Sequence, residues 1–172
     1  MKPCVVVVFA AAILSTSGFA QDPPVNSPLL DRLAGKWISQ VSIGGQTGTH
    51  DIDAKWVLDH HYLRLHEVSR EKDAKGNPQY EAMVFIASNR QNQEYACAWL
   101  DVFGGLSVQS IGTAIPKENQ VPFIFKDESG ATVLSNVFTY DPKADSWEWR
   151  IDNVDNGKAI LFGMEKLTRV KR

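Results

Sequence analysis

The sequence predicts an all-β fold, an antiparallel up-and-down β-barrel of about ten strands with a short N-terminal helix. Short runs in which apolar and polar residues alternate follow one another, and after residue 35 no long segment keeps a helical period. Nearly all connections are short and rich in Gly, Asn, Asp and Pro, which favours antiparallel neighbours. A series of hairpins leaves two open edges unless its first and last strands pair, so we favour a barrel over a sandwich.

The first 20 residues have the pattern of a secretory signal. Lys2 is followed by an apolar run from Cys4 to Leu14, and small residues precede Gln21. This run is shorter than the roughly 20 residues that span a bilayer. We therefore expect an exported protein, periplasmic or secreted, with no stable membrane span once residues 1–20 are removed.

The remaining chain has the length of one domain. We expect residues 21–28 to form a flexible segment and residues 29–172 to form a single barrel. In "SPLLDRLAG", Ser27 can cap a helix, Pro28 suits its first turn and Gly35 ends it. The predicted strands cover residues 36–43, 50–58, 61–70, 79–87, 94–101, 106–112, 121–127, 131–140, 146–154 and 158–167.

Turn chemistry assigns the two faces of the second and third strands. A two-residue turn at Asp59–His60 pairs Trp56 with Leu63. The same register places Leu58 and Glu67 on the face that these side chains share. That face is mostly apolar, so it is the predicted interior of the barrel.

A second strong hairpin turn, Asn156–Gly157, assigns the faces of the last two strands. Phe138 joins their apolar face if the loop "PKAD" has four residues. The predicted interior pairs are Ile151 with Phe162 and Trp149 with Met164. The opposite face, expected to be solvated, carries Glu148, Arg150 and Asp152.

The stretch "DHHYLRLHEVSRE", residues 59–71, holds three of the four histidines. On a strand, His60 and His66 lie roughly 20 Å apart, and His61 points to the other face. Zinc needs its ligand nitrogens within about 2.1 Å of one ion, so this stretch alone cannot bind a metal. His50 could approach His66 across the hairpin, but two histidines lack a placed third ligand. We predict no metal site.

Two other polar positions in this stretch matter. His66 is expected to contact Asp53 on the outer face, an exposed pair of little energetic weight. Glu67 is assigned to the interior, where a carboxylate needs a partner or a raised pKa. Alternatively, Glu67 lies at the rim of the barrel and reaches water.

The predicted interior contains aromatic and polar candidates for a binding site. The inward tryptophans either pack as a core or line a cavity, because a wide barrel is not filled by its side chains alone. Asp101 precedes the Gly-Gly turn of "VFGGLS" and is also assigned to the interior. The predicted ligand-binding residues are Trp56, Glu67, Trp99, Asp101, Asn136, Phe138 and Trp149.

Three functions fit these observations. The first is a barrel that binds or carries a small, mostly apolar molecule. The second is an enzyme that uses Glu67 and Asp101 as acid and base. The third is a filled barrel that acts through its outer face, as an envelope or partner-binding protein.

Other classes of function lack their motifs. The chain has no phosphate loop, nucleophile elbow or dinucleotide fingerprint, and we expect no cofactor. A net charge of −2 without a basic face argues against a nucleic-acid partner. Cys97 has no inward histidine near it, so we expect a small buried apolar residue rather than a nucleophile.

The segment "LLDRLAGKW", Leu29 to Trp37, resembles the start of lipocalins and other calycin-type barrels, which open with a short helix and a Gly-x-Trp. The resemblance implies that Trp37 closes one end of the barrel beneath Lys166 or Arg169. Together with "HDIDAKWVLDHHYLRLHEVSRE", "YEAMVFIA", "WLDVFGG" and "FTYDPKADSWEWRIDN", it is similar to exported bacterial lipocalin-like proteins close to the family known as DUF1579. That family implies the fold and export but no agreed activity. Nitrobindin-like barrels bind haem through a histidine near the C-terminus, and no histidine follows His66 here.

Overall fold

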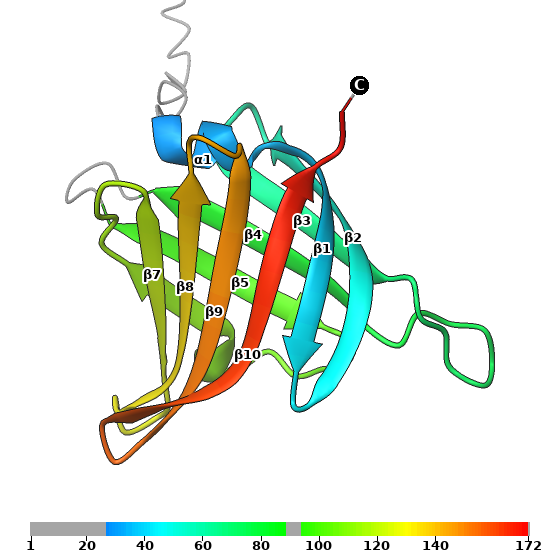
Figure 1. The fold of residues 1–172 in the computed structure, drawn as a ribbon. Helices are drawn as coiled ribbons and strands as arrows, with labels where there is room; N and C mark the ends of the chain where they lie inside the picture. Colours follow the sequence, from blue (N-terminus) through cyan, green and yellow to red (C-terminus); the bar gives the residue numbers. More distant parts are fainter. Residues whose placement is uncertain (1–26, 89–93, 172) are drawn as a thin grey trace, which may run out of the picture.

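The computed structural model of the chain is an antiparallel barrel of ten strands (Figure 1) and describes residues 27–88 and 94–171. Each strand pairs with its neighbours in the sequence, and β1 pairs with β10 to close the barrel. The predicted all-β up-and-down barrel and short helix are confirmed. The predicted signal at residues 1–20 lies outside the described residues, as does most of the segment 21–28.

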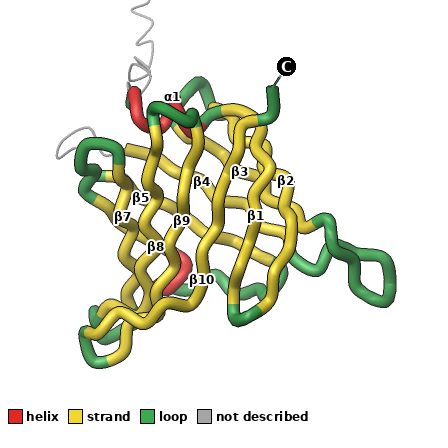
Figure 2. Tube along the Cα trace, in the orientation of Figure 1, coloured by secondary structure: helices red, strands yellow, loops and turns green. Residues whose placement is uncertain are grey.

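The described elements follow the expected order, and Figure 2 shows that strands make up nearly all of the barrel wall. The helical elements are α1 (Pro28–Leu33) and the short 3-10 turn η1 (Val108–Ser110). The first five strands are β1 (Gly35–Ile43), β2 (Gln46–Val57), β3 (Tyr62–Ser69), β4 (Glu81–Ser88) and β5 (Tyr95–Asp101). The last five are β6 (Ile111–Ala114), β7 (Gln120–Lys126), β8 (Thr132–Asp141), β9 (Ser146–Asp155) and β10 (Lys158–Arg169). No helix among these residues is long and apolar enough to cross a membrane.

The predicted strand at residues 106–112 is largely wrong. Its first part is a loop that leads into η1, and only β6 remains as a strand. Ser107 caps η1: its side chain accepts a hydrogen bond from the Gln109 backbone, and its own backbone N–H donates to the Ser110 hydroxyl. This local hydrogen bonding replaces the ladder that a longer strand would need.

The predicted register of β2 with β3 is confirmed, because Trp56 pairs with Leu63 and Ile52 pairs with Glu67. The turn itself differs from the expectation. The three residues Leu58, Asp59 and His60 all have positive φ angles, of 50°, 54° and 65°. The longer turn carries Leu58 out to solvent, where it is 69 % exposed, instead of into the interior.

The predicted register of β9 with β10 is wrong by one residue beyond a β-bulge. The bulge lies between Leu161 and Gly163, so Ile151 pairs with Gly163 and not with Phe162. Glycine is required at the bulge, since a Cβ on Gly163 would lie 2.5 Å from Cγ1 of Ile43. The shift matters for the interior: Glu165 takes the place beside Trp149 that we predicted for Met164. Asp152 is also buried rather than solvated, with Arg150 donating two hydrogen bonds to its carboxylate.

Helix α1 covers one end of the barrel (Figure 1). The indole N–H of Trp37 donates to the Leu33 carbonyl at 2.8 Å, which fixes the helix against β1. The guanidinium carbon of Arg169 lies 4.0 Å from the centre of the Trp37 ring. Lys166 is exposed, so Arg169 is the basic residue at this closed end.

The barrel interior beneath α1 is filled by aromatic and aliphatic side chains. Phe138 stacks on Trp149 with ring centres 4.3 Å apart, and Phe123 meets Phe138 edge to face at 5.4 Å. Such offset and edge contacts are the favoured geometries of aromatic pairs. This packed half leaves the other end of the barrel to hold the candidate site.

Candidate functional site

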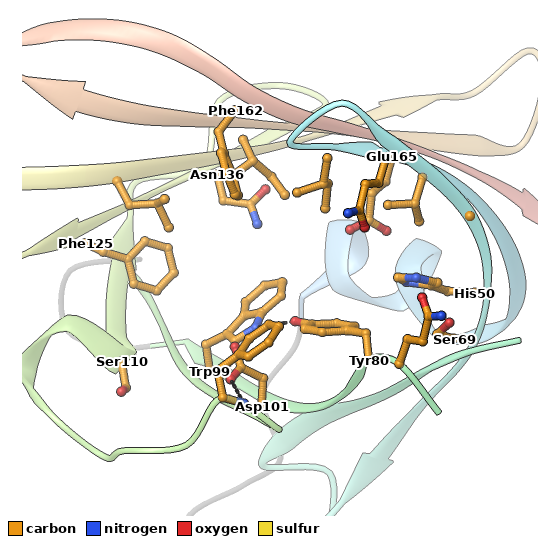
Figure 3. Close-up of a pocket in the computed structure, with 18 of the residues that line it drawn as sticks. His50, Ser69, Tyr80, Trp99, Asp101, Ser110, Phe125, Asn136, Phe162 and Glu165 are labelled. Carbon is orange, nitrogen blue, oxygen red and sulfur yellow. Dashed lines mark hydrogen bonds between the residues drawn. The ribbon is translucent and has the colours of Figure 1, made fainter. Parts of the chain in front are cut away.

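A cavity of about 550 Å³ occupies the half of the barrel away from α1, because its lining includes residues of the β1–β2 hairpin and of the loop after β5. Residues from the β1–β2 hairpin, β10 and the loop after β5 form its mouth, and Figure 3 shows the side chains that surround it. One part of its wall is apolar and includes Val41, Ile43, Phe125, Leu134, Ile151 and Phe162. The polar part includes His50, Ser69, Tyr80, Asp101, Asn136 and Glu165.

A buried polar cluster lies at the inner polar wall. His50 on β2 and Glu67 on β3 are joined by a 2.5 Å contact between Nδ1 and Oε1. Glu165 on β10 completes the cluster, with one ligand-type atom of each of the three residues within 4.8 Å of the others. Ser39 on β1 donates a 2.8 Å hydrogen bond to Oε2 of Glu165. Exposure of Glu67 and Glu165 is only 1 % and 2 %, so neither carboxyl reaches bulk water.

Burial controls the protonation of this cluster, because a low-dielectric site disfavours charge. Burial raises the pKa of Glu67 to about 8. Burial first, and then the negative charge of Glu67, raise the pKa of Glu165 well above its ordinary value. Burial also lowers the pKa of His50. The three groups therefore favour their neutral forms near pH 7.

Tyr80 and Trp99 form the wall opposite the apolar side. The indole N–H of Trp99 donates to the Tyr80 hydroxyl at 3.1 Å, and the Tyr80 ring stacks on His50 at 5.5 Å. Burial raises the pKa of Tyr80, so its phenol stays neutral. Figure 3 shows Tyr80 between Trp99 and His50. This arrangement offers a ligand both an aromatic surface and a hydroxyl group.

Asn136 adds an unsatisfied polar group to the cavity. Its side chain is 2 % exposed, and its Oδ1 atom has no hydrogen-bond partner among the described residues. A buried acceptor left without a donor costs about 1–3 kcal/mol. A ligand that donates a hydrogen bond to Asn136 would recover that free energy.

The predicted site residues fall into three groups. Trp99, Asp101 and Asn136 line the cavity, and Glu67 lies in the cluster that includes the cavity-lining His50 and Glu165. Phe138 and Trp149 face inward as predicted but belong to the packed core and not to the cavity wall.

Trp56 also lies away from the cavity. It is at the α1 end of the barrel, where its indole N–H donates to Asp31 at 2.8 Å and its ring stacks on His60 at 4.1 Å. The inward register was correct, but β2 runs the full height of the barrel, so its last residues reach the closed end.

Asp101 does not act with Glu67 as a close pair. Both residues pair with Ala82, which places them on strands to either side of β4 at one level of the barrel. Asp101 accepts a 2.9 Å hydrogen bond from the backbone of Phe103 and so orders its own loop. The near partners of Glu67 are His50 and Glu165.

The remaining predicted contacts of polar residues also differ. His66 lies on the outer face and opposite Asp53 in the register, as expected, but the 2.7 Å contact of its side chain is with Glu81. Cys97 is buried, and burial raises the pKa of its thiol to about 12. This agrees with the expected apolar role for Cys97.

Sequence patterns did not identify His50, Tyr80 and Glu165 as members of the site. Glu165 was missed because the straight register of β10 points it outward. The isolated Gly163 within "LFGMEK" was the available signal, since a glycine inside a strand often marks a bulge. His50 was considered only as a partner of His66, which the structure places on the opposite face of the sheet.

Comparison with protein-family models and with curated proteins finds no match to this chain.

Proposed function

We propose that this protein binds a small, mostly apolar molecule inside the barrel, as an exported lipocalin-like carrier. The observation that carries the proposal is the cavity of about 550 Å³ at one end of an otherwise packed barrel. Typical small-molecule sites have volumes of about 300–1,000 Å³, apolar walls and a few polar groups. The cavity agrees with each of these properties.

The mouth of the cavity also favours an apolar ligand. Phe103 and Phe162 line it and are 81 % and 43 % exposed. Leu106, in the same loop as Phe103, is 75 % exposed. Large exposed apolar groups that gather at one place commonly mark a binding surface. An apolar ligand would contact these side chains before it reaches the interior.

The polar wall would orient the ligand. Asn136 offers a free acceptor, and the neutral Tyr80 hydroxyl faces the same space. We therefore expect a ligand with an apolar body and a polar end group that includes a donor. A filled barrel that acts only through its outer face would bind no such ligand in its interior, so this expectation distinguishes the two functions.

Native mass spectrometry of protein purified from an exporting host, without detergent, tests the proposal. We expect an added mass that disappears under denaturing conditions and that fragments as an apolar compound. A titration with an apolar fluorescent dye then measures the site directly. Leu134→Trp, which fills the cavity from its apolar wall, should weaken dye binding at least about tenfold, equivalent to about 1.4 kcal/mol.

Leu100→Trp is the matched control, because it places the same side chain on the outer face of β5, where Leu100 is 39 % exposed. It should leave dye binding unchanged. Equal dye binding by the wild-type protein and both variants would place the dye outside the cavity and contradict the proposal.

Acid–base catalysis is a second candidate function, favoured by the 2.5 Å contact between His50 and Glu67 beside the cavity. The geometry supports Glu67 and Glu165 as its carboxyl groups better than the predicted pair of Glu67 and Asp101. Turnover of the ligand found by mass spectrometry, lost in Glu67→Gln, would establish it. Release of the ligand unchanged after prolonged incubation would leave the carrier function alone.

A further inference from the structure

The cluster of His50, Glu67 and Glu165 brings three metal-ligating side chains together from distant parts of the sequence. They come from β2, β3 and β10, and one nitrogen or oxygen atom from each lies within 4.8 Å of the others. All three side chains are buried, with exposed fractions of 7 %, 1 % and 2 %. The convergence is therefore built by the barrel and does not arise from a local run of charges.

The two carboxyl groups have few hydrogen-bond partners for buried carboxylates: Glu67 contacts His50, and Glu165 accepts from Ser39. Oε2 of Glu67 has no hydrogen-bond partner among the described residues, and the adjacent group is the Glu165 carboxyl. Among the described residues, no arginine or lysine acts on either carboxyl group. Two buried carboxyl groups in contact must share a proton or bind a cation, since uncompensated charge in an interior is strongly unfavourable.

We propose that His50, Glu67 and Glu165 bind a divalent transition-metal ion of the zinc class. One imidazole nitrogen and two carboxylate oxygens are a suitable ligand set for such an ion. Two carboxylates and a neutral imidazole balance a dication, so the buried site becomes electrically neutral. Zinc needs its ligand atoms at about 2.0–2.2 Å, so binding requires the two glutamate side chains to turn towards the ion.

The surroundings of the cluster suit an ion that remains accessible from the cavity. His50 and Glu165 line the cavity, so the fourth coordination position faces it. Ser39 donates to Oε2 of Glu165, which leaves the other oxygen for the ion and holds the carboxylate in place. A ligand in the cavity with an oxygen or nitrogen donor could occupy the open position.

This inference goes beyond the carrier function and does not depend on it. Untagged protein is freed of metal with a chelator and titrated with Zn²⁺ by calorimetry and with Co²⁺ by visible absorption. We expect one ion per chain and a Co²⁺ spectrum of low coordination number. Glu67→Gln and Glu165→Gln should each weaken binding more than about 100-fold, and Ser39→Ala about 10–100-fold.

His66→Asn is the matched control, because His66 also contacts a glutamate, at 2.7 Å, but on the outer face. It should bind Zn²⁺ with wild-type affinity. Far-UV circular dichroism checks the fold of each variant. In the wild-type protein, diamagnetic Zn²⁺ should shift the NMR signals of the His50 ring more than those of the His66 ring, a readout that needs no variant.

Absence of saturable binding to the wild-type protein would overturn the inference, as would unchanged binding in both glutamine variants. Dye binding is measured on the same metal-free protein. Dye binding without metal binding would reject the metal site alone, whereas metal binding without dye binding would reject only the carrier function.

Discussion

At the scale of single residues, Arg169 connects the last strand to the start of the barrel. Its guanidinium donates two hydrogen bonds to Asp145 and one each to the carbonyls of Ala34 and Arg32. It also lies over Trp37 at 4.0 Å. A planar group with five donors suits this position better than a lysine ammonium would.

Gly35 makes this arrangement possible. Its φ angle is 139°, and a Cβ there would lie 2.4 Å from Nη1 of Arg169. We predict that Gly35→Ala destabilises the protein by about 1–3 kcal/mol through backbone strain, with about 1 kcal/mol more from the displaced hydrogen bond to Ala34. Urea unfolding followed by tryptophan fluorescence measures the change.

Gly76→Ala separates the two causes of that loss. Gly76 also has a positive φ, of 85°, but no atom lies within 4 Å of the position of its Cβ. It should therefore show the strain without the displaced arginine. Equal losses of stability at the two glycines would mean that Arg169 contributes nothing measurable.

At the scale of elements, the bulge in β10 decides which side chain enters the polar cluster. Gly163 allows β10 to lie close to β1. A Cβ on residue 163 would lie 2.5 Å from Cγ1 of Ile43 and 3.2 Å from the Ser42 carbonyl oxygen. The residue two positions later, Glu165, then faces the interior. Close packing of this kind tolerates little added volume.

We predict that Gly163→Ala destabilises the protein by about 1–3 kcal/mol because of overpacking. It should also disturb the position of Glu165, so Zn²⁺ binding should weaken in parallel. Ile43→Ala removes the nearest clashing atom, and the double variant should regain part of the lost stability. Strict additivity of the two single changes in a double-mutant cycle would show that the contact is not the cause.

The elements also show where sequence reasoning succeeded and where it could not. Alternation and turn residues were enough to place Trp56 opposite Leu63 and Phe138 on the interior face. They did not show how high along the barrel each inward residue lies, so Trp56 and Trp149 were assigned to a cavity that neither lines. Height depends on strand tilt and stagger, which arise only when all ten strands close. The polar cluster could not be predicted for a similar reason. His50 contacts Glu67, 17 positions later in the sequence, and Ser39 contacts Glu165, 126 positions later.

At the scale of the whole molecule, the barrel has one packed end and one hollow end. The packed end holds the aromatic core, α1 and Arg169, and the hollow end holds the cavity. This division lets a single domain hold an internal site without a separate lid. The core supplies the stability, and the residues around the cavity can keep polar groups that a packed interior would exclude.

The wall of the barrel is not equally strong around its circumference. Strand β6 has only four residues, and it pairs with β7 at Gly112 and Thr113 alone. By contrast, β9 and β10 pair along most of their length. We predict that the amides of β6 exchange with deuterium faster than those of any other strand, because fewer hydrogen bonds must open.

Hydrogen exchange followed by mass spectrometry measures this order. The amides of β9 are the internal reference for the slowest exchange. Protection of β6 equal to that of β9 would contradict the prediction. A bound ligand that contacts Phe125, which packs against Gly112, should slow the exchange of β6.

The bulge in β10 also bears on how chains of this type can vary in length. Phe162 is the one residue between Leu161 and Gly163, and it has no partner on β9. A related chain without a bulge would keep the same interior if it were one residue shorter at this point. An alignment of such chains should therefore need a one-residue gap between Gly157 and Glu165. An alignment that keeps the lengths equal would pair Glu165 with an outward-facing residue of the relative.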